Sequence, residues 1–445
     1  MATAVVSPLL SNLATTAMAA TMTATTETHA LRRIRRSLPA VLMRAGTSKG
    51  LFIHRAHLPL LEADWEGPLL AAMGSRYNDA RQLDGLGGAT SVTSKVAVVA
   101  PSNRPGIDVD YTFVQVAVGL DKIDLSGNCG NMVSGVGPFA LQEKLVIPPP
   151  GVQSVDVRIF NTNTSRVIIE TVLLDQYGEL EEDGNCVIPG VNGPGAPIKV
   201  AFVEPAGSMT GKMFPSGMRS ESIYVEGVGS LSPFTVDVTL VDIANPFVVV
   251  DARTLPLSVQ SGESASALNI KVAEAIRQRG AVLMGLAASN DAAFLRRGTP
   301  KLAIVSRPAP NASGKVVADI QIQAYSMGKP HQSLPLTGAV CMAGAVCMEG
   351  TVPYRLARSQ PKPAEGALTP ARTPTPTGEG PYDSEKTNML RHSGNIKETV
   401  GLAHPRGYME MEVWKTIDGN GVSIERCIGI RTARRLFEGN VLYYM

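Results

Sequence analysis

The sequence has little of what marks several large classes of protein. Aromatic residues make up only 5% of its 445 residues, and charged residues only 18%. The 41 Lys and Arg residues nearly balance the 39 Asp and Glu residues, which leaves a net charge of +2. Nucleic-acid binders carry a strong basic excess, and single-strand binders stack bases on aromatic side chains. The composition therefore argues against a nucleic-acid partner.

Membrane spans, metal motifs and disulfide patterns are also missing from the sequence. No apolar run approaches the ~20 residues that cross a bilayer, so no membrane partner is expected. Neither Cys-x-x-Cys nor His-Glu-x-x-His occurs, which argues against a metal. The five cysteines are odd in number and irregularly spaced, as in proteins of reducing compartments.

The first residues differ in composition from the rest. Residues 1–30 are mostly Ala, Thr and Ser with a single acid, Glu27, and four arginines follow within 31–36. This composition is typical of an organelle transit peptide, and equally of a disordered extension with a basic end. We therefore expect residues 1–37 to lie outside the folded part, and the protein to be cytoplasmic or mitochondrial.

The remaining sequence divides into two halves of similar plan. Each half has short β-branched strands and one apolar helix rich in small residues, at 128–146 and 337–349. A helix that is hydrophobic on every side is buried. We predict an N-terminal domain over 38–190, completed by a C-terminal strand, and a C-terminal domain over 191–435. The Pro-rich stretch 359–381 is predicted to be an insertion.

Several familiar motifs are only approximate. Residues 207–212 resemble a P-loop but have Ala206 and Met213 where Gly and Ser or Thr are required. Residues 85–90 begin like a dinucleotide fingerprint, but a predicted strand follows. Residues 46–50 match the Gly-x-Ser-x-Gly elbow, which must turn into a helix. Since a strand follows here too, hydrogen-bond donation fits this loop better than a Ser48 nucleophile.

One cysteine lies in an unusual context. Cys129 stands between Asn128 and Gly130 at the start of the first apolar helix. A helix start offers free N–H groups and partial positive charge, which lower a thiol pKa and attract carboxylates. A purely structural cysteine is more often found mid-helix. This context favours a functional Cys129.

Two further segments carry candidate chemistry. Lys95 enters an apolar strand, and desolvation lowers a lysine pKa toward that of a general base. The alternative is a lysine that extends its ammonium to solvent at a strand end. His331 precedes Thr337-Gly338 at the start of the second apolar helix, which is a second place for a carboxylate.

Five segments in order along the chain resemble the PrpF family, which comprises methylaconitate and aconitate isomerases and oxalomesaconate tautomerases. The segments are Arg44-Ala45-Gly46-Thr47-Ser48-Lys49-Gly50, Gly87-Gly88, Thr93-Ser94-Lys95-Val96-Ala97, Asn128-Cys129-Gly130-Asn131, and His331 with Thr337-Gly338. The resemblance implies an α/β (α+β), diaminopimelate epimerase-like fold. In that fold two similar domains each wrap a mixed β-sheet around a central buried helix.

The resemblance also implies roles for individual residues. Lys95 and Cys129 fall on the family's catalytic lysine and motif cysteine. The positions implied to bind substrate are Thr47, Ser48, Lys49, Ser94, Asn128, Gly130, Asn131, Ser326, Met327, His331, Thr337 and Gly338. One departure matters: the epimerases pair two cysteines at helix starts, whereas Cys341 lies one turn inside the second helix.

The expected function is a cofactor-independent isomerase that needs no metal. It would move a proton in an unsaturated polycarboxylate such as aconitate or 2-methylaconitate, by a double-bond shift or cis-trans isomerisation. The alternatives are a keto-acid tautomerase of oxalomesaconate type, an amino-acid racemase using Cys129 and Cys341, and a non-catalytic carboxylate binder. The expected partners are the small carboxylate and, as a homodimer, a second copy of the chain.

Overall fold

A computed structural model describes residues 33–310, 314, 316–358, 395–419 and 421–445. The first strand begins at Arg35, so residues 35–37 belong to the folded part rather than to the extension. Residues 1–32 and the predicted insertion at 359–381 lie outside the described residues. Among the described residues, no helix combines the length and apolar character that a membrane crossing requires.

The sheet contains one pattern of seven strands twice. The strands of the first set, in spatial order, are β1 (Arg35–Ala45), β2 (Ser48–His54), β3 (Lys95–Pro101), β4 (Val109–Val116), β6 (Ser154–Asn161), β7 (Arg166–Leu173) and β8 (Ile198–Val203). Those of the second set are β10 (Phe234–Asp242), β11 (Pro246–Asp251), β12 (Lys301–Ser306), β13 (Ile320–Ser326), β15 (Asn395–His404), β16 (Gly407–Asp418) and β17 (Gly421–Arg431).

Strand directions repeat along with the order. Successive neighbours in the first set pair antiparallel, parallel, antiparallel, parallel, antiparallel and antiparallel. The second set follows the same sequence of directions. β8 and β17 pair antiparallel and join the two sets. β18 (Ala433–Tyr444) adds a strand beside β1, and β9 (Glu221–Val225) adds a strand beside β10. With the short β5 (Ile123–Asp124) and β14 (Lys329–Pro330), this makes one mixed sheet of 18 strands among the described residues.

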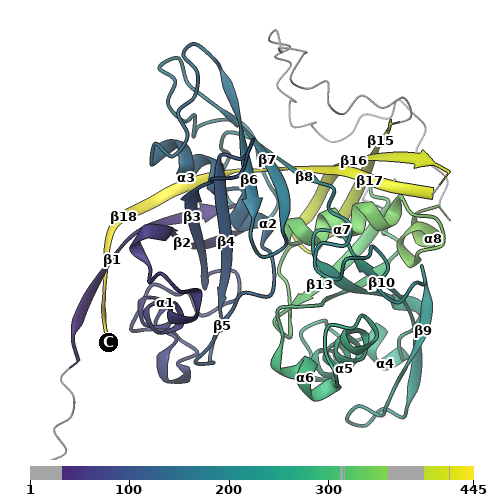
Figure 1. Ribbon diagram of the computed structural model, residues 1–445. Helices are drawn as coiled ribbons and strands as arrows, with labels where there is room; N and C mark the ends of the chain where they lie inside the picture. The colour runs from purple at the N-terminus through teal and green to yellow at the C-terminus, as the bar shows by residue number, and fades with distance from the viewer. Residues whose placement is uncertain (1–32, 311–313, 315, 359–394, 420) are drawn as a thin grey trace, which may run out of the picture. The chain divides into compact units, whose positions relative to one another are not determined.

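Apolar helices lie against these strands (Figure 1). The helix predicted over 128–146 consists of α2 (Gly130–Val133) and α3 (Val136–Gln142). The break falls at Gly135 rather than at Pro138, which sits in the first turn of α3 where proline is tolerated. A Cβ on Gly135 would lie 2.6 Å from the ring of Phe52, so a glycine is needed where β2 approaches.

The second apolar helix is α7 (Leu336–Val346), in which every residue is buried. It shares one hydrophobic core with α2 and α3. Two smaller cores lie under α1 (Glu66–Met73) and under α5 (Ala267–Leu283). The remaining α-helices are α4 (Leu257–Gln260), α6 (Asn290–Leu295) and α8 (Val352–Arg358). Apolar helices packed on strand faces give a mixed α/β fold.

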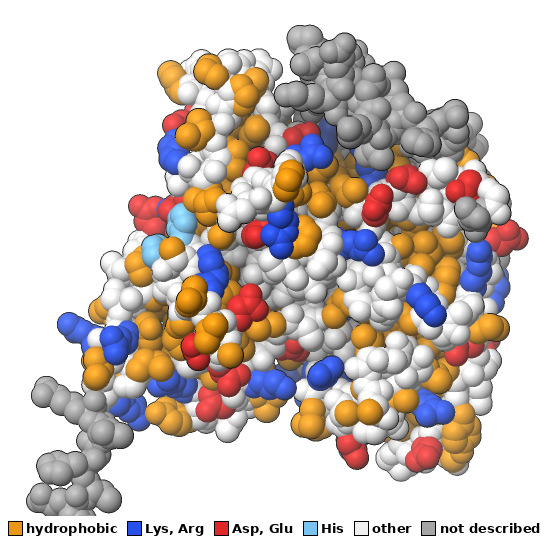
Figure 2. Space-filling view, in the orientation of Figure 1, with side chains coloured by type: hydrophobic (Ala, Val, Ile, Leu, Met, Phe, Trp, Pro, Cys, Tyr) orange, Lys and Arg blue, Asp and Glu red, His pale blue; other side chains and the backbone are white. Residues whose placement is uncertain are grey.

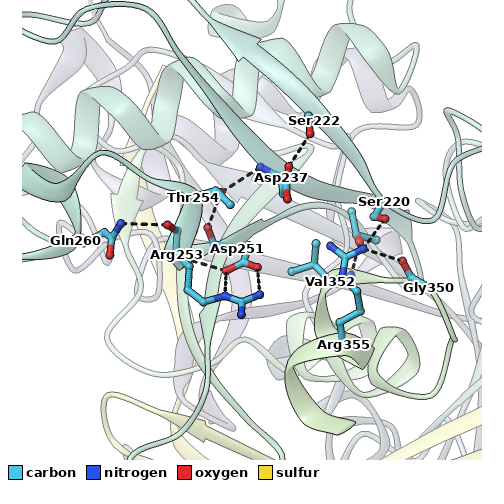
Figure 3. A network of polar contacts seen from close by, with 11 residues as sticks. Ser220, Ser222, Asp237, Asp251, Arg253, Thr254, Gln260, Gly350, Val352 and Arg355 are labelled. Carbon is cyan, nitrogen blue, oxygen red and sulfur yellow. Dashed lines mark hydrogen bonds and ion pairs between the residues drawn. The ribbon is translucent and has the colours of Figure 1, made fainter. Parts of the chain in front are cut away.

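A polar network fixes the end of β11 (Figure 3). The carboxylate of Asp251 accepts hydrogen bonds from Nε and Nη2 of Arg253, at 3.0 and 2.7 Å. Burial raises the pKa of Asp251, but these bonds outweigh burial and lower it overall. Thr254 Oγ1 donates to Asp251 O and accepts from the backbone N–H of Asp237, which joins this turn to β10. The face of the molecule in Figure 2 mixes both charge signs, without a broad field of either.

Glu170 in β7 is fully buried, and no charged side chain among the residues that the structure describes pairs with it. Its Oε2 accepts from the backbone N–H of Gly137 at 2.7 Å, while its Oε1 has no hydrogen-bond partner. Burial raises its pKa well above the usual value, despite that hydrogen bond. The folded protein therefore holds a proton on Glu170 that the unfolded chain releases.

This difference makes stability depend on pH in a defined direction. Near pH 4 both states bind the proton, because the unfolded pKa is about 4.3. As the pH rises toward the folded pKa, folding costs about 1.4 kcal/mol more for each unit. We expect Glu170→Gln to unfold at higher denaturant concentration than the wild type at pH 8, with the gap shrinking toward pH 5.

Denaturant titrations at pH 5, 6.5 and 8 measure this gap. Glu179→Gln is the control, because Glu179 is exposed in its ion pair with Lys144. The control should differ little from the wild type at any of these pH values. A gap for Glu170→Gln that is constant with pH would contradict the protonated, buried carboxyl.

Candidate active site

A cavity lies where the starts of β3 and β12 approach Cys129. Eleven residues line it, and five of them were expected from the sequence: Lys95, Asn128, Cys129, Ser326 and Met327. The other six are Phe113, Gln115, Asp124, Gly127, Gly298 and Lys301. The two sets of strands therefore both contribute to one polar site.

Cys129 is the N-cap residue of α2 and is only 6% exposed. Burial raises its pKa, but the positive charges of Lys95 and Lys301 oppose burial and lower the pKa overall. Hydrogen bonds from the backbone N–H groups of Asn131 and Met132 act in the same direction. These neighbours make the Cys129 thiol easier to deprotonate, since a buried thiol without them would keep its proton.

Lys95 is the first residue of β3 and is 7% exposed. Its Nζ donates to Gln115 Oε1 at 2.7 Å and lies 5.0 Å from the ring centroid of Phe113. The amide of Gln115 is oriented by its own Nε2, which donates to Ser94 O at 2.8 Å. Burial lowers the pKa of Lys95, against the opposing effect of Cys129. Lysine and thiol therefore form a buried pair whose pKa values are both lowered.

Lys301 was missed by the sequence analysis. It opens β12, its Nζ lies 3.5 Å from Asn128 O, and burial lowers its pKa to about 8. A signal was present: Thr93-Ser94-Lys95-Val96-Ala97 has a counterpart in Thr299-Pro300-Lys301-Leu302-Ala303. The two lysines open equivalent strands of the repeated pattern.

The starts of the two apolar helices touch beside this cavity. A Cβ on Gly130 would lie 3.0 Å from the backbone nitrogen of Thr337, so glycine permits the close approach of α2 and α7. Buried side-chain atoms without a hydrogen-bond partner include Ser48 Oγ, Asn128 Oδ1 and Thr337 Oγ1. Both polar atoms of the Asn245 amide, in the turn between β10 and β11, are also unpartnered. Buried polar groups are normally satisfied, so such atoms call for an explanation such as a ligand.

A second group of polar side chains surrounds Asn131. Its Nδ2 donates to Thr47 Oγ1 at 2.9 Å, and its Oδ1 accepts from Nε of the buried Arg431 at 3.1 Å. Ser333 Oγ donates to the same Thr47 hydroxyl at 3.2 Å. Arg431 and Ser333 were not predicted, because their segments lie far from Asn131 in the sequence.

His331 lies in this second group as a neutral ring. Its Nδ1 donates to Ser333 O at 2.8 Å, and burial lowers its pKa to about 4 despite that bond. The charges of Lys95 and Lys301 lower that pKa further, which places His331 near both lysines. His331 therefore stays uncharged at neutral pH.

Three predicted site residues serve the strands or the core rather than the cavity. Lys49 pairs with Arg44 across the hairpin, one position from Ser48 and Gly50. A Cβ on Gly50 would meet Met132 of α2, so strand alternation turns Lys49 to the opposite face. The Ser94 hydroxyl donates to Val116 O and accepts from Gln82 Nε2, and it serves the strand rather than the site. Gly338 packs toward Phe247 and Leu334 within the core.

Cys341 does not form a second reactive thiol. It is fully buried in α7, and burial raises its pKa well above the usual value. Among the residues that the structure describes, no three His, Cys, Asp or Glu side chains gather as metal ligands would. Lys95, Lys301 and Cys129 are the groups lining this cavity whose pKa values are lowered.

Comparisons with known proteins show which proteins this chain is similar to. The chain is 32% identical to the 2-methyl-aconitate isomerase of Shewanella oneidensis, over 90% of this chain and 96% of the relative. It is 34% identical to the 4-oxalomesaconate tautomerase of Pseudomonas putida, over 91% of this chain and 95% of the relative. A solved structure of methylitaconate-delta-isomerase matches with 30% identity and a TM-score of 0.62, over 92% of this chain and 96% of that one.

The family model described as "PrpF protein" matches residues 35–365, which is more than half of the chain. That range contains both apolar helices, both lysines and Cys129. The chain therefore belongs to the PrpF family.

Proposed function

We propose that this protein is a cofactor-independent isomerase of an unsaturated polycarboxylate, with aconitate or 2-methylaconitate as the leading candidates. One observation carries the proposal: a buried lysine and a buried thiol, both with lowered pKa, face one cavity. An allylic proton shift requires a base and an acid that face the same substrate, and this pair supplies one of each.

The proposed reaction needs only groups of this chain. Lys95, as the neutral amine, removes a proton from the carbon next to the double bond. The electron pair of the broken C–H bond moves through the double bond onto a carboxylate, which forms an enolate-like dianion. Cys129 then returns a proton at the other end of the allyl unit, and the proton on Lys95 passes back to the thiolate. The same pair serves the reaction with the two roles exchanged.

The polar atoms without partners support a polycarboxylate as the substrate. The unpartnered hydroxyls of Ser48 and Thr337 come from two different segments. Donors of this kind bind carboxylate oxygens and leave no buried donor unsatisfied. The relatives' names refer to methylaconitate, oxalomesaconate and methylitaconate, which are all unsaturated carboxylates.

A keto-acid tautomerase of oxalomesaconate type is the second candidate. It is favoured by the 34% identity to the Pseudomonas putida tautomerase, and the same proton carriers would serve it. A two-thiol racemase has less support, because the raised pKa of Cys341 keeps that thiol protonated. We also propose a diaminopimelate epimerase-like arrangement of two similar domains, over 38–190 and 191–435, on the strength of the repeated strand pattern.

Proton NMR in D₂O tests the function directly. The purified protein is incubated with cis-aconitate, trans-aconitate or 2-methylaconitate, and the vinyl and methylene signals are followed. We expect loss of signal at the allylic carbon and the appearance of a new isomer for one of them. Exchange only at the carbon next to a ketone of a keto acid would support the tautomerase instead.

Removing either proton carrier should abolish most of this exchange. We expect Lys95→Ala and Cys129→Ala each to lower the isomerisation rate about 10²–10⁴-fold, because proton transfer by a positioned side chain contributes that much. Thermal unfolding verifies that both variants fold. Wild-type turnover in a folded Lys95→Ala protein would rule out the mechanism.

Removing the Thr337 hydroxyl should affect substrate binding but not lower the stability of the fold. Thr337→Val removes a buried hydroxyl that has no partner, so stability should stay equal or rise. If that hydroxyl binds a substrate carboxylate, KM rises about 10-fold, the loss of one hydrogen bond to a charged group.

Thr239→Val is the matched control. Thr239 Oγ1 donates to Arg219 O at 2.7 Å and accepts from the backbone N–H of Val352 at 2.9 Å. Its replacement should lower the free energy of unfolding by about 1–3 kcal/mol and leave KM unchanged. An unchanged KM in Thr337→Val would remove Thr337 from the binding site.

A further inference from the structure

We propose that Lys301 is a second functional lysine of this site, and that it binds the substrate carboxylate onto which negative charge moves during proton transfer. This inference rests on the proposed function, because it assumes a polycarboxylate substrate. It assigns to Lys301 a role different from that of Lys95, which handles the proton.

The fold places Lys301 by the same means as Lys95. Lys95 opens β3 and faces Gly50 of the parallel neighbour β2. Lys301 opens β12 and faces Phe247 of the parallel neighbour β11. Since the strand pattern repeats, the two ammonium groups approach the cavity from the two strand sets, with Cys129 interacting with both.

The two lysines differ in how their hydrogen-bonding capacity is used. The Lys95 ammonium has a short bond of 2.7 Å to the fixed amide of Gln115. Lys301 Nζ has a long hydrogen bond of 3.5 Å to Asn128 O. Among the described residues, Lys301 takes part in no ion pair. An ammonium has three N–H donors. Lys301 therefore retains donors for a ligand.

The nearest acid does not occupy these donors. Asp124 attracts Lys301 electrostatically, but its Oδ1 accepts from the backbone N–H of Ser126 at 2.8 Å and from the Ser126 hydroxyl at 2.5 Å. Lys301 also borders a small cavity against α5, yet its ammonium contacts Asn128 on the side of Cys129. A carboxylate entering the cavity would meet an unpaired, desolvated cation there.

Such a cation is suited to the step that limits an allylic shift. Charge develops on the carboxylate oxygens as the C–H bond breaks, and a preorganised cation in a dry cavity stabilises that charge. Lys95 cannot serve both as the neutral amine that accepts the proton and as the cation that holds the carboxylate. Two lysines on equivalent strands divide these tasks.

Calorimetry with tricarballylate tests the assignment. This saturated tricarboxylate has no allylic proton, so binding is measured without turnover. We expect Lys301→Met to bind it about 10–100-fold more weakly, the loss expected for a hydrogen bond to a charged group. Lys301→Arg should recover part of the affinity because it keeps the charge, and Lys301→Gln replaces Lys301→Met if the latter does not fold.

The matched control is Lys271→Met, a substitution of an exposed lysine on α5. It should bind tricarballylate as the wild type does. Glutarate, which lacks one of the three carboxylates, adds a readout that a merely structural role would not change. If Lys301 holds a carboxylate, the preference of the wild type for tricarballylate over glutarate should narrow in Lys301→Met.

The outcomes are distinct. A folded Lys301→Met variant that binds tricarballylate as tightly as the wild type, and prefers it over glutarate to the same extent, would overturn the assignment. The proposed function would still stand, and Lys301 would act only on the charge of Cys129. A wild-type protein that neither binds tricarballylate nor exchanges allylic protons would overturn the proposed function, and this inference with it.

Discussion

The site depends on the electrostatic coupling of one buried thiol to two lysines that line the same cavity. Burial alone would raise the pKa of Cys129 and keep the proton on sulfur. Lys95 and Lys301 reverse that shift, and burial at the same time lowers the pKa of both lysines. This combination lowers the pKa of a thiol and of two amines in the same cavity. The surrounding fold keeps the thiol and the two ammonium groups close to one another.

The repeated strand pattern holds Cys129, Lys95 and Lys301 together. Each lysine opens a strand that lies between a parallel and an antiparallel neighbour. The glycine at 130 lets α2 and α7 begin side by side, which brings Cys129 to both strand starts. A shift of the backbone at the start of β3, β12 or α2 would move the thiol and the lysines apart. Their electrostatic interaction would then weaken, because Coulomb energy falls with distance. The apolar helices are therefore part of the chemistry and not only of the core.

Local patterns in the sequence could indicate only part of this site. Cys129 and Lys95 stood out because Asn, Gly and an apolar strand flank them, and the family match of 35–365 confirms the recognition. Lys49 and Ser94 were also expected, but strand alternation turns Lys49 away and the Ser94 hydroxyl is used within the strand layer. Lys301 and Arg431 escaped notice because their roles arise from pairings between strands far apart in the chain. Residue type shows what a group can do, whereas only the tertiary fold shows which groups meet.

The charges around Cys129 fit the proposed reaction. His331 is neutral and burial lowers the pKa of Lys95, which favours its neutral amine, whereas Lys301, with a pKa of about 8, keeps its charge at neutral pH. An anionic substrate entering such a cavity raises the proton affinity of every nearby base. The amine of Lys95 therefore becomes a stronger base at the moment when a C–H bond must be broken. Substrate charge therefore supplies part of the driving force for proton removal.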